Sequence, residues 1–355
     1  MAVLNPREEL VSLLRGSFSC PMISSLGKRG VLTLMLEKPF TVESFSEIVD
    51  KDLFASVLIY FVSLGLLKSA GQVDKSGQQT YVVTEFGDKI FRRYGSFNLL
   101  NSYGAFLSKI DEMLFEPFNE EKPRCDRLEN VIGSGQTNGR KFFPKALAML
   151  EKMNLGLIAD IGCGDGNFLS RVMNIFPAVS VIASDISKTS VDFTMQNLKK
   201  LFPEAQIDSV LTNAADVESW ASVVAEHSQG TQGQTVISMW YLIHEISQGK
   251  EEVVIDFLTR IHKACPQAGI MIGEIVAIPE DVLATNRYGS IMPEFLFFHD
   301  VSGQGVLGWD QYQSILTKIP YELAGESLFD IVKDGDGELP TGFVWHLKPK
   351  KVGKQ

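Results

Sequence analysis

Three glycines at alternate positions, Gly162, Gly164 and Gly166, form the most informative cluster in the sequence. They follow an apolar segment that predicts a strand over 157–161 and precede a helical pattern over 167–176. A glycine-rich turn between a strand and a helix lets the backbone approach a ligand, and the helix N-terminus adds a favourable dipole. A dinucleotide site prefers the spacing G-x-G-x-x-G, but position 167 holds Asn. The alternative is a merely tight turn.

Two acids sharpen this prediction. Asp160 lies two residues before Gly162, where a carboxylate could meet an ammonium group such as that of S-adenosylmethionine. Asp185 closes the second predicted strand, where an acid can accept hydrogen bonds from both ribose hydroxyls. The third strand leads into a polar turn, 212–216, that is suited to the adenine edge. The predicted cofactor-binding residues are Asp160, Gly162, Gly164, Gly166, Asp185, Ile186, Asn213, Ala214 and Trp240.

Two histidines are candidates for the chemistry. His244 lies in the segment Trp240-Tyr-Leu-Ile-His244-Glu245, just after the fourth predicted strand. His299 lies in Phe297-Phe-His299-Asp300-Val-Ser-Gly-Gln-Gly, after the fifth. Histidine is the usual general base near neutral pH and a common metal ligand. Since both follow strands of one sheet, the two rings could converge on a metal ion; a structural role for either is the alternative.

The elements that must position these residues alternate between strand and helix from about residue 140. Such alternation predicts a parallel sheet with helices on both faces. The stretch 279–308 interrupts it and is expected to cap a site or form an interface. Strands are predicted over 157–161, 179–183, 207–211, 234–240 and 269–276, with a final pair at 327–332 and 342–347 and a helix over 188–201.

The first hundred residues are predicted to be mostly helical. A helix over 54–67 precedes a polar stretch (69–79), a short strand (81–84) and a helix over 85–94 that Thr84 caps. A helix, a short strand, a polar wing, a short strand and a helix in this order form a winged-helix pattern. Residues 1–100 hold eleven Lys and Arg against ten Asp and Glu, without a basic stripe, so a packing and dimerisation domain is favoured over DNA binding. The expected domains are 1–140 and 141–355.

Composition narrows the class of protein. The chain has 355 residues, 45% of them hydrophobic, and a formal charge of −10, which argues against binding nucleic acid through phosphates. No apolar run reaches membrane-spanning length, and four widely spaced cysteines suggest free thiols. A cytoplasmic protein that binds neither membrane nor nucleic acid is expected.

The motif D-x-G-x-G-x-G, with an acid at the second strand, resembles the class I S-adenosylmethionine-dependent methyltransferases. With the winged-helix-like N-terminal part, nearly the whole chain resembles their O-methyltransferase-like dimeric branch. That resemblance implies an α/β, Rossmann-like methyltransferase domain preceded by a mostly helical dimerisation and substrate-capping domain, and a homodimer. The segment ending in His244-Glu245 is similar to the branch's W-x-L-H-D segment, in which the histidine is the general base.

One feature is similar to a narrower group, the α-keto acid C-methyltransferases. The combination of W-x-x-x-H-E with F-F-H-D-x-S-G-Q-G looks like this group, whose members methylate the carbon beside the keto group of phenylpyruvate, 2-ketoisocaproate or 2-ketoarginine. The resemblance implies that His244 and His299 hold an iron ion that the substrate chelates. The segment 133–140 (GSGQTNGR) is also similar to this group, which makes Arg140 a candidate partner for a carboxylate.

The expected reaction is therefore methylation of C3 of an α-keto acid through a metal-chelated enolate. A pair of imidazoles suits Fe, Zn, Ni or Cu, so iron rests on the resemblance. Glu245 could orient a ligand, act as a base or face solvent. A guanidino substrate would want a carboxylate, for which Glu274, Glu294 or Asp300 could serve. The alternatives are a metal-free O-methyltransferase with His244 as base and, in another class, a cofactor-sensing winged-helix regulator.

Overall fold

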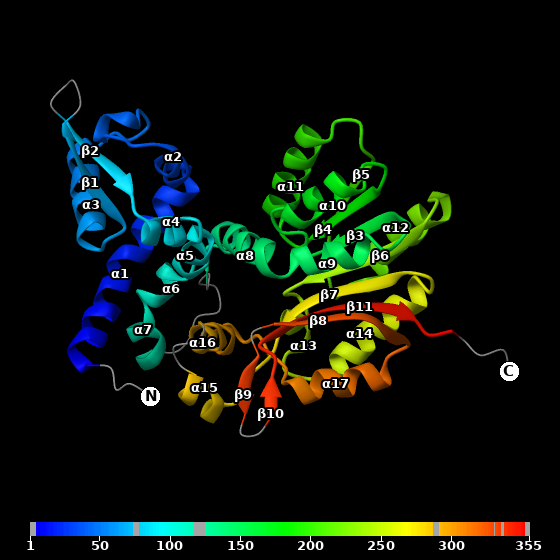
Figure 1. Cartoon of the computed structure of the whole chain (residues 1–355). Coiled ribbons are helices and arrows are strands. Elements are labelled where there is room, and N and C mark those ends of the chain that lie inside the picture. Colours follow the sequence, from blue (N-terminus) through cyan, green and yellow to red (C-terminus); the bar gives the residue numbers. More distant parts are fainter. Residues whose placement is uncertain are drawn as a thin grey trace. The chain divides into compact units, whose positions relative to one another are not determined.

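The structure is a computed structural model that describes residues 5–73, 78–116, 125–286, 291–329, 331–334 and 337–351. The chain divides into two compact units, Met1–Thr137 and Asn138–Gln355 (Figure 1). Within the described residues, no helix is long and apolar enough to cross a membrane.

The first unit is mostly helical around one small hairpin. Strands β1 (Leu67–Val73) and β2 (Gln79–Val83) pair antiparallel between α3 (Lys51–Ser63) and α4 (Glu85–Phe91). This confirms the predicted order of helix, strand, strand and helix, with Thr84 Oγ1 accepting from the Gly87 amide at 2.9 Å as the cap of α4. The remaining helices are α1 (Pro6–Lys28), α2 (Val31–Glu37), η1 (Val42–Ser44), α5 (Tyr94–Asn101), α6 (Gly104–Leu107), α7 (Ile110–Phe115) and α8 (Arg127–Lys141), which ends in the second unit.

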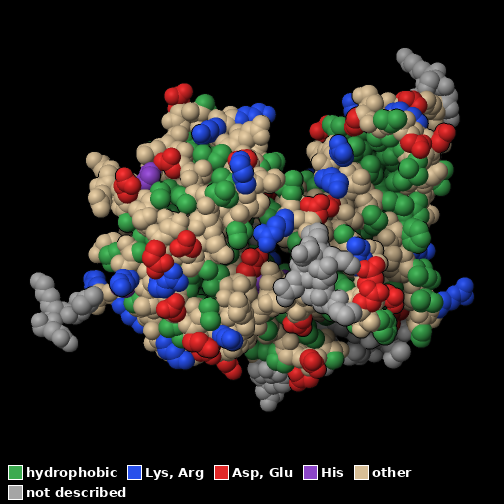
Figure 2. All heavy atoms as spheres, turned by 180° about the vertical axis from the view of Figure 1, so that it is seen from behind, with side chains coloured by type: hydrophobic (Ala, Val, Ile, Leu, Met, Phe, Trp, Pro, Cys, Tyr) green, Lys and Arg blue, Asp and Glu red, His purple; other side chains and the backbone are tan. Residues whose placement is uncertain are grey.

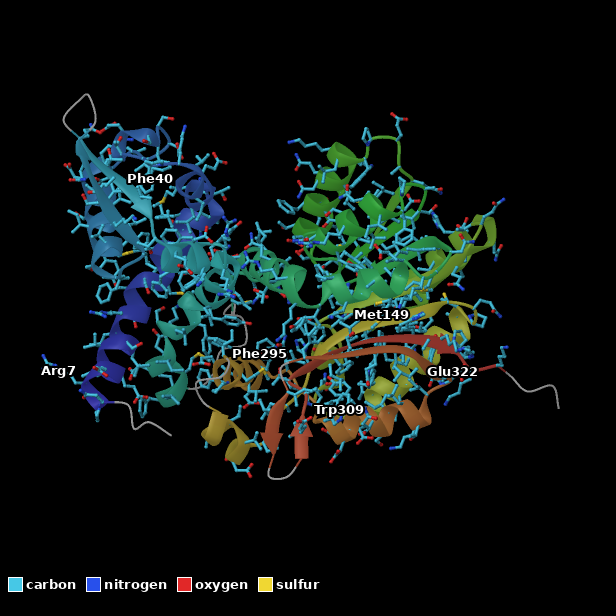
Figure 3. The ribbon with its side chains drawn as sticks, viewed as in Figure 1. Arg7, Phe40, Met149, Phe295, Trp309 and Glu322 are labelled. Atoms are coloured by element: carbon cyan, nitrogen blue, oxygen red, sulfur yellow. The ribbon has the colours of Figure 1, made fainter. Side chains whose placement is uncertain are left out.

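Helix α3 begins and ends earlier than the sequence predicts, because local hydrogen bonds fix its boundaries. The Leu53 amide donates to Asp50 Oδ1 at 2.9 Å, so the helix starts at Lys51 rather than at Phe54. It stops before Gly65, whose φ of +73° is left-handed. The buried faces of α2, α3, α4 and the hairpin meet in an aromatic core in which Phe40, Phe45 and Phe54 pack edge to face. Phe40 is labelled in Figure 3.

The second unit is a seven-stranded sheet in the order β5-β4-β3-β6-β7-β11-β8. Strands β3 (Leu155–Ile161), β4 (Ser180–Asp185), β5 (Ile207–Leu211), β6 (Gln234–Trp240) and β7 (Gly269–Ile275) are parallel. Strand β11 (Gly342–Pro349) pairs antiparallel with β7 and with β8 (Tyr321–Phe329). From β3 the chain adds β4 and β5 on one side of the sheet and then β6 and β7 on the other. The boundary between β3 and β6 is therefore the switch point at which ligands of such folds bind.

Helices cover both faces of this sheet, as the alternation predicts (Figure 1). Strand β3 shows why: Ala159 and Ile161 pack into one core, and Ile158 packs into the other. One face is covered by α12 (Val217–Gly230), α14 (Glu251–Ala264) and α17 (Trp309–Lys318), and the other by α9 (Phe143–Leu150), α10 (Asn167–Ile175) and α11 (Lys188–Leu201). The sheet therefore holds the carboxyl ends of β3, β4, β6 and β7 at one edge.

The predicted insertion leaves this sheet after β7 and returns to it. It contains α15 (Glu280–Asn286) and α16 (Met292–Ser302), and its residues 287–290 lie outside the described residues. Its two ends are held together, because the Ala277 amide donates to the Leu307 carbonyl at 2.9 Å. Ile278, Val282 and Met292 form a small core of their own, against which Val332 and Leu339 pack.

The end of the chain departs from the prediction. Strand β8 begins at Tyr321, not at Ser327, and a hairpin of β9 (Val332–Asp334) and β10 (Gly337–Leu339) follows it. The start of β8 was missed because it is an edge strand with a largely exposed pattern that includes Glu322 and Glu326.

Candidate active site

The glycine-rich turn joins β3 to α10 at the carboxyl edge of the sheet. Gly162, Gly164 and Gly166 all have left-handed φ angles, of 76°, 58° and 71°. A Cβ on Gly166 would also lie only 2.8 Å from Thr194 Cγ2 on α11. The turn therefore needs glycines for its backbone conformation and, at Gly166, for space.

Asp185, at the end of β4, ties this turn to the neighbouring strand. Its Oδ2 accepts from the Gly164 amide at 3.1 Å, and its Oδ1 accepts from the Ser187 amide at 2.8 Å. The amides of Gly162 and Cys163 both donate to the Ser184 carbonyl. The carboxylate predicted to bind ribose thus lies directly beside the turn, with lone pairs left for further donors.

Asp160 is buried at the end of β3, where Ser238 Oγ donates to its Oδ1 at 2.6 Å. Burial, with a smaller contribution from the nearby Asp185 and Asp165, raises the pKa of Asp160 to about 8, although the hydrogen bond from Ser238 acts in the opposite direction. No basic side chain in the described part of the chain forms an ion pair with Asp160. A buried carboxyl without a cationic partner suits a ligand that brings its own positive charge.

The other predicted cofactor residues lie along the same edge. Ile186 is 53% exposed directly after Asp185, as an apolar surface that a planar base could cover. Asn213 Oδ1 accepts from the Ala215 amide, and the Ala214 carbonyl accepts from Trp220 Nε1, so the turn after β5 is locally braced. Trp240 is nearly buried at the end of β6, where its ring packs against Phe143 and Phe168 at centroid distances of 5.0 and 4.5 Å.

His244 lies at the same edge in the short helix α13 (Ile243–Ser247) and is held by Glu274 of β7. The His244 Nδ1 atom lies 2.9 Å from Glu274 Oε1, and both side chains are buried. Glu274 Oε2 also accepts from the amides of Ile243 and His244, at 2.8 and 3.2 Å. The carboxylate therefore fixes both the ring and the backbone of α13, with Nε2 left as the available ring nitrogen.

His299, on α16, meets His244 at this point. The two ring centroids are 4.6 Å apart with planes at 80°. His299 Nδ1 lies 2.6 Å from the Phe295 carbonyl, and the Phe295 ring stacks on His299 at 3.8 Å. Both imidazoles thus have Nδ1 engaged by an oxygen, which leaves Nε2 of each ring available for a substrate or a metal ion.

The two histidines differ in charge. Burial opposes protonation of His244, but the charge and hydrogen bond of Glu274 outweigh it, so its pKa is raised from the ordinary value. Burial and the neighbouring His244 lower the pKa of His299 to about 4. Near neutral pH the site therefore pairs an imidazole able to hold a proton with a neutral one.

Tyr241 lies between the end of β6 and α13 and has a strained backbone. Its φ of 53° is left-handed, which is costly for an aromatic residue. Its amide donates to the Gly273 carbonyl at 2.9 Å, and its ring lies 6.3 Å from both His244 and Phe295. The rings of Tyr241 and Phe295, the latter labelled on α16 in Figure 3, form an aromatic wall beside the histidines.

The remaining acidic and basic candidates lie differently. Glu245, Glu294 and Asp300 have exposed side chains, and so does Arg140 at the end of α8. The sequence predicts Glu274 only as a possible partner for a guanidino substrate, whereas its carboxylate is occupied by His244 and by backbone amides. This role is hard to predict from sequence, because Glu274 is 30 positions from His244 and only the pairing of β6 with β7 brings the two residues together.

The sequence predicts that His244 and His299 hold a metal ion. Among the described residues, no group of three or more His, Cys, Asp or Glu side chains could hold a metal ion. His244 and His299 fit as two imidazole ligands, because the engaged Nδ1 atoms orient both rings. Further ligands would have to come from substrate or water.

Comparison with known proteins identifies the fold. No protein-family profile and no curated protein matches the chain. Human N-acetylserotonin methyltransferase, solved with S-adenosylmethionine, is 17% identical, with a TM-score of 0.60 over 99% of this chain and 100% of that one. An O-methyltransferase family protein from Burkholderia thailandensis is 12% identical, with a TM-score of 0.60 over 99% of this chain and 100% of that one. A riboflavin-derivative dimethyltransferase from Streptomyces davawensis is 13% identical, with a TM-score of 0.53 over 98% of this chain and 100% of that one.

These likenesses extend over both units, so the chain has the predicted fold: a Rossmann-like α/β domain preceded by a mostly helical unit.

Proposed function

We propose that the protein is an S-adenosylmethionine-dependent methyltransferase that acts on a small molecule with a weakly acidic C–H or O–H group. The observation that carries this proposal is the buried His244–Glu274 pair beside the glycine-rich turn. Leu242, two residues before His244, lies next to Gly162, since a Cβ added there would be 3.5 Å from Leu242 Cδ1. The methyl donor and the acid–base group would thus share one edge of the sheet.

The residues divide the work between binding and chemistry. Asp160 binds the ammonium group of the cofactor, Asp185 binds the ribose hydroxyls, and Ile186 packs against the adenine. His244 faces the substrate and holds or receives a proton at Nε2, while Glu274 stabilises the imidazolium. Methyl transfer from a sulfonium needs a nucleophile held in line with the methyl carbon, and such positioning supplies much of the rate.

The leading candidate reaction is methylation of C3 of an α-keto acid. It is favoured by His299, because a general-base mechanism has no evident use for a second buried imidazole 4.6 Å from His244. His244 and His299 would hold a transition metal, for which iron is the first candidate by resemblance. Such a metal would supply Lewis-acid stabilisation of the enolate.

A metal-free O-methyltransferase is the second candidate. It is favoured by the His244–Glu274 pair, which is complete without a metal and raises the pKa of His244 toward that of an effective base. In that mechanism His244 Nε2 would remove the proton of a phenol, and His299 would serve only as a neutral hydrogen-bonding group.

The side chain of the keto acid is more consistent with an aromatic or branched group than with a guanidino group. Glu274 is occupied, and Glu294 and Asp300 are exposed, so none of the three carboxylates considered for a guanidinium lies free beside His299. The rings of Tyr241 and Phe295 offer apolar contact instead.

A substrate screen tests both candidates. Purified enzyme, with and without chelator treatment, is assayed for S-adenosylhomocysteine formation with phenylpyruvate, 2-ketoisocaproate, 2-ketoarginine and a set of phenols. C-methylation predicts activity with the first two keto acids that chelator removes and added metal restores. Chelator-resistant activity on phenols alone would favour the O-methyltransferase, and no turnover with any acceptor would count against both.

We also propose that the first unit forms a homodimer. Helix α1 exposes Leu10, Leu13, Leu14 and Phe18, at 56 to 69%, with the spacing of one helical face. Hydrophobic side chains also gather on the first unit's part of the face in Figure 2. The double change Leu14→Asp and Phe18→Asp should give a monomer in light scattering, whereas a wild-type monomer would contradict the proposal.

A further inference from the structure

Arg171 is a basic residue beside the glycine-rich turn. It lies on α10, four residues after Asn167, and its Nε donates to Asn167 Oδ1 at 2.7 Å. Because side chains on a helix lean toward its N-terminus, the guanidinium lies at the start of α10, where the turn ends. The Arg171 Cζ atom lies 5.9 Å from the centre of the Phe143 ring, so this ring covers one side of the guanidinium.

Among the residues that the structure describes, the terminal nitrogens of Arg171 have no anionic partner. None of the acidic side chains in the described part of the chain lies within ion-pair distance of this guanidinium, whereas Arg92 and Arg260 pair with Asp88 and Glu218. Arg171 is also partly buried. An arginine with both terminal nitrogens unpaired at such a place can bind a carboxylate with two parallel hydrogen bonds.

Gly139, near the end of α8, leaves space for this side chain. A Cβ at position 139 would lie 2.8 Å from Arg171 Nη2 and 3.3 Å from its Cζ. A side chain here would displace the guanidinium from its present position, so a glycine in the segment 133–140 has a specific use.

The charges around the turn favour a cation of this kind. Asp160, Asp165 and Asp185 surround the turn, and Asp160 and Asp165 are buried enough that their pKa values rise to about 8 and about 6. These acids suit the ammonium and sulfonium groups of S-adenosylmethionine but would repel its carboxylate. Arg171, whose charge acts against the rise at Asp165, and the N-terminus of α10 offset that repulsion.

We propose that Arg171 binds the carboxylate at the amino-acid end of the cofactor while Asp160 binds its ammonium group. This inference rests on the proposed function. It assigns the two charges of the amino acid to two side chains at opposite ends of the turn, one on β3 and one on α10.

Calorimetry with two ligands tests it. S-adenosylhomocysteine carries both charged groups, and its decarboxylated analogue keeps the amine but lacks the carboxylate. Arg171→Gln should weaken S-adenosylhomocysteine binding about 10- to 100-fold, as expected for a charge-assisted pair, and leave the analogue unchanged. Gly139→Ala, which keeps Arg171 but displaces it, should act in the same direction to a smaller degree.

Arg260→Gln is the matched control, because it removes an arginine that pairs with Glu218 at the surface of the same unit. Its affinity for both ligands should equal that of the wild type. If Arg171→Gln weakens both ligands equally, the residue only supports the turn, and if it changes only the KM of the acceptor, it serves the substrate; either result overturns the inference. A wild type that binds neither ligand would instead reject the proposed function.

Discussion

The two halves of the sheet's carboxyl edge are built by different means. Beside β3 and β4, the site consists of a glycine turn and acids close to it in sequence, and Asp185 joins it through backbone amides. Beside β6 and β7, it is assembled from side chains on separate elements: His244 on α13, Glu274 on β7 and His299 on α16. The first half is suited to binding a ligand through backbone and charge, and the second to moving protons. Changes in the two halves should therefore have separable effects.

The largest effect is expected from His244→Ala. Since His244 is the group that faces the reacting atoms in both candidate mechanisms, methyl transfer should fall by about 10²- to 10⁴-fold. The affinity for S-adenosylhomocysteine should stay near the wild-type value, because the glycine turn is untouched. Steady-state kinetics and calorimetry measure the two quantities, and a parallel loss of both would mean that the halves are not independent.

Glu274→Gln should have a smaller effect that depends on pH. The carboxylate raises the pKa of His244, so as long as His244 must be deprotonated to act, wild-type activity rises with pH through that raised value. Removing the charge lowers this pKa, and the acidic limb of the pH–rate profile should move to lower pH. The plateau should also fall, by about 10-fold or more, because the ring loses its partner. An unmoved acidic limb would contradict the role of Glu274.

The smallest effect is a proton released on cofactor binding. With a pKa of about 8, Asp160 is mostly protonated at pH 7 in the free protein. An ammonium group beside it favours the charged form, so binding should release up to about one proton. Titrations with S-adenosylhomocysteine in buffers of different ionisation enthalpy measure that number. Asp160→Asn should abolish it, whereas equal release from the variant would place the proton elsewhere.

Much of the first half of the site could be predicted from sequence, because its residues lie close together in the chain. The G-x-G-x-G spacing, the acid before it and the acid at the end of β4 are local patterns, and periodicity placed the strands that carry them. The order of the parallel strands then brings Asp160 and Asp185 to one edge without further information.

The second half could be predicted only in part. His244 and His299 stand out because histidine is rare in this chain. Glu274 is a single acid in an apolar strand, and nothing in the surrounding sequence indicates its partner. Its role follows from the parallel pairing of β6 with β7, which places its carboxylate under α13. Arg171 was missed for a related reason: the helical pattern shows that it lies on α10, but not that its terminal nitrogens are left unpaired.

Product analysis with S-adenosylmethionine labelled with ¹³C in its methyl group tests the central claim most directly. The enzyme is incubated with this cofactor and phenylpyruvate, and the product is examined by carbon and proton NMR. The account predicts a labelled methyl group on C3, with a signal typical of a methyl bonded to carbon and coupled to one neighbouring proton. His299→Ala should reduce this signal strongly. A labelled methoxy signal, full activity of His299→Ala, or no transfer of label to phenylpyruvate would contradict carbon methylation of this keto acid.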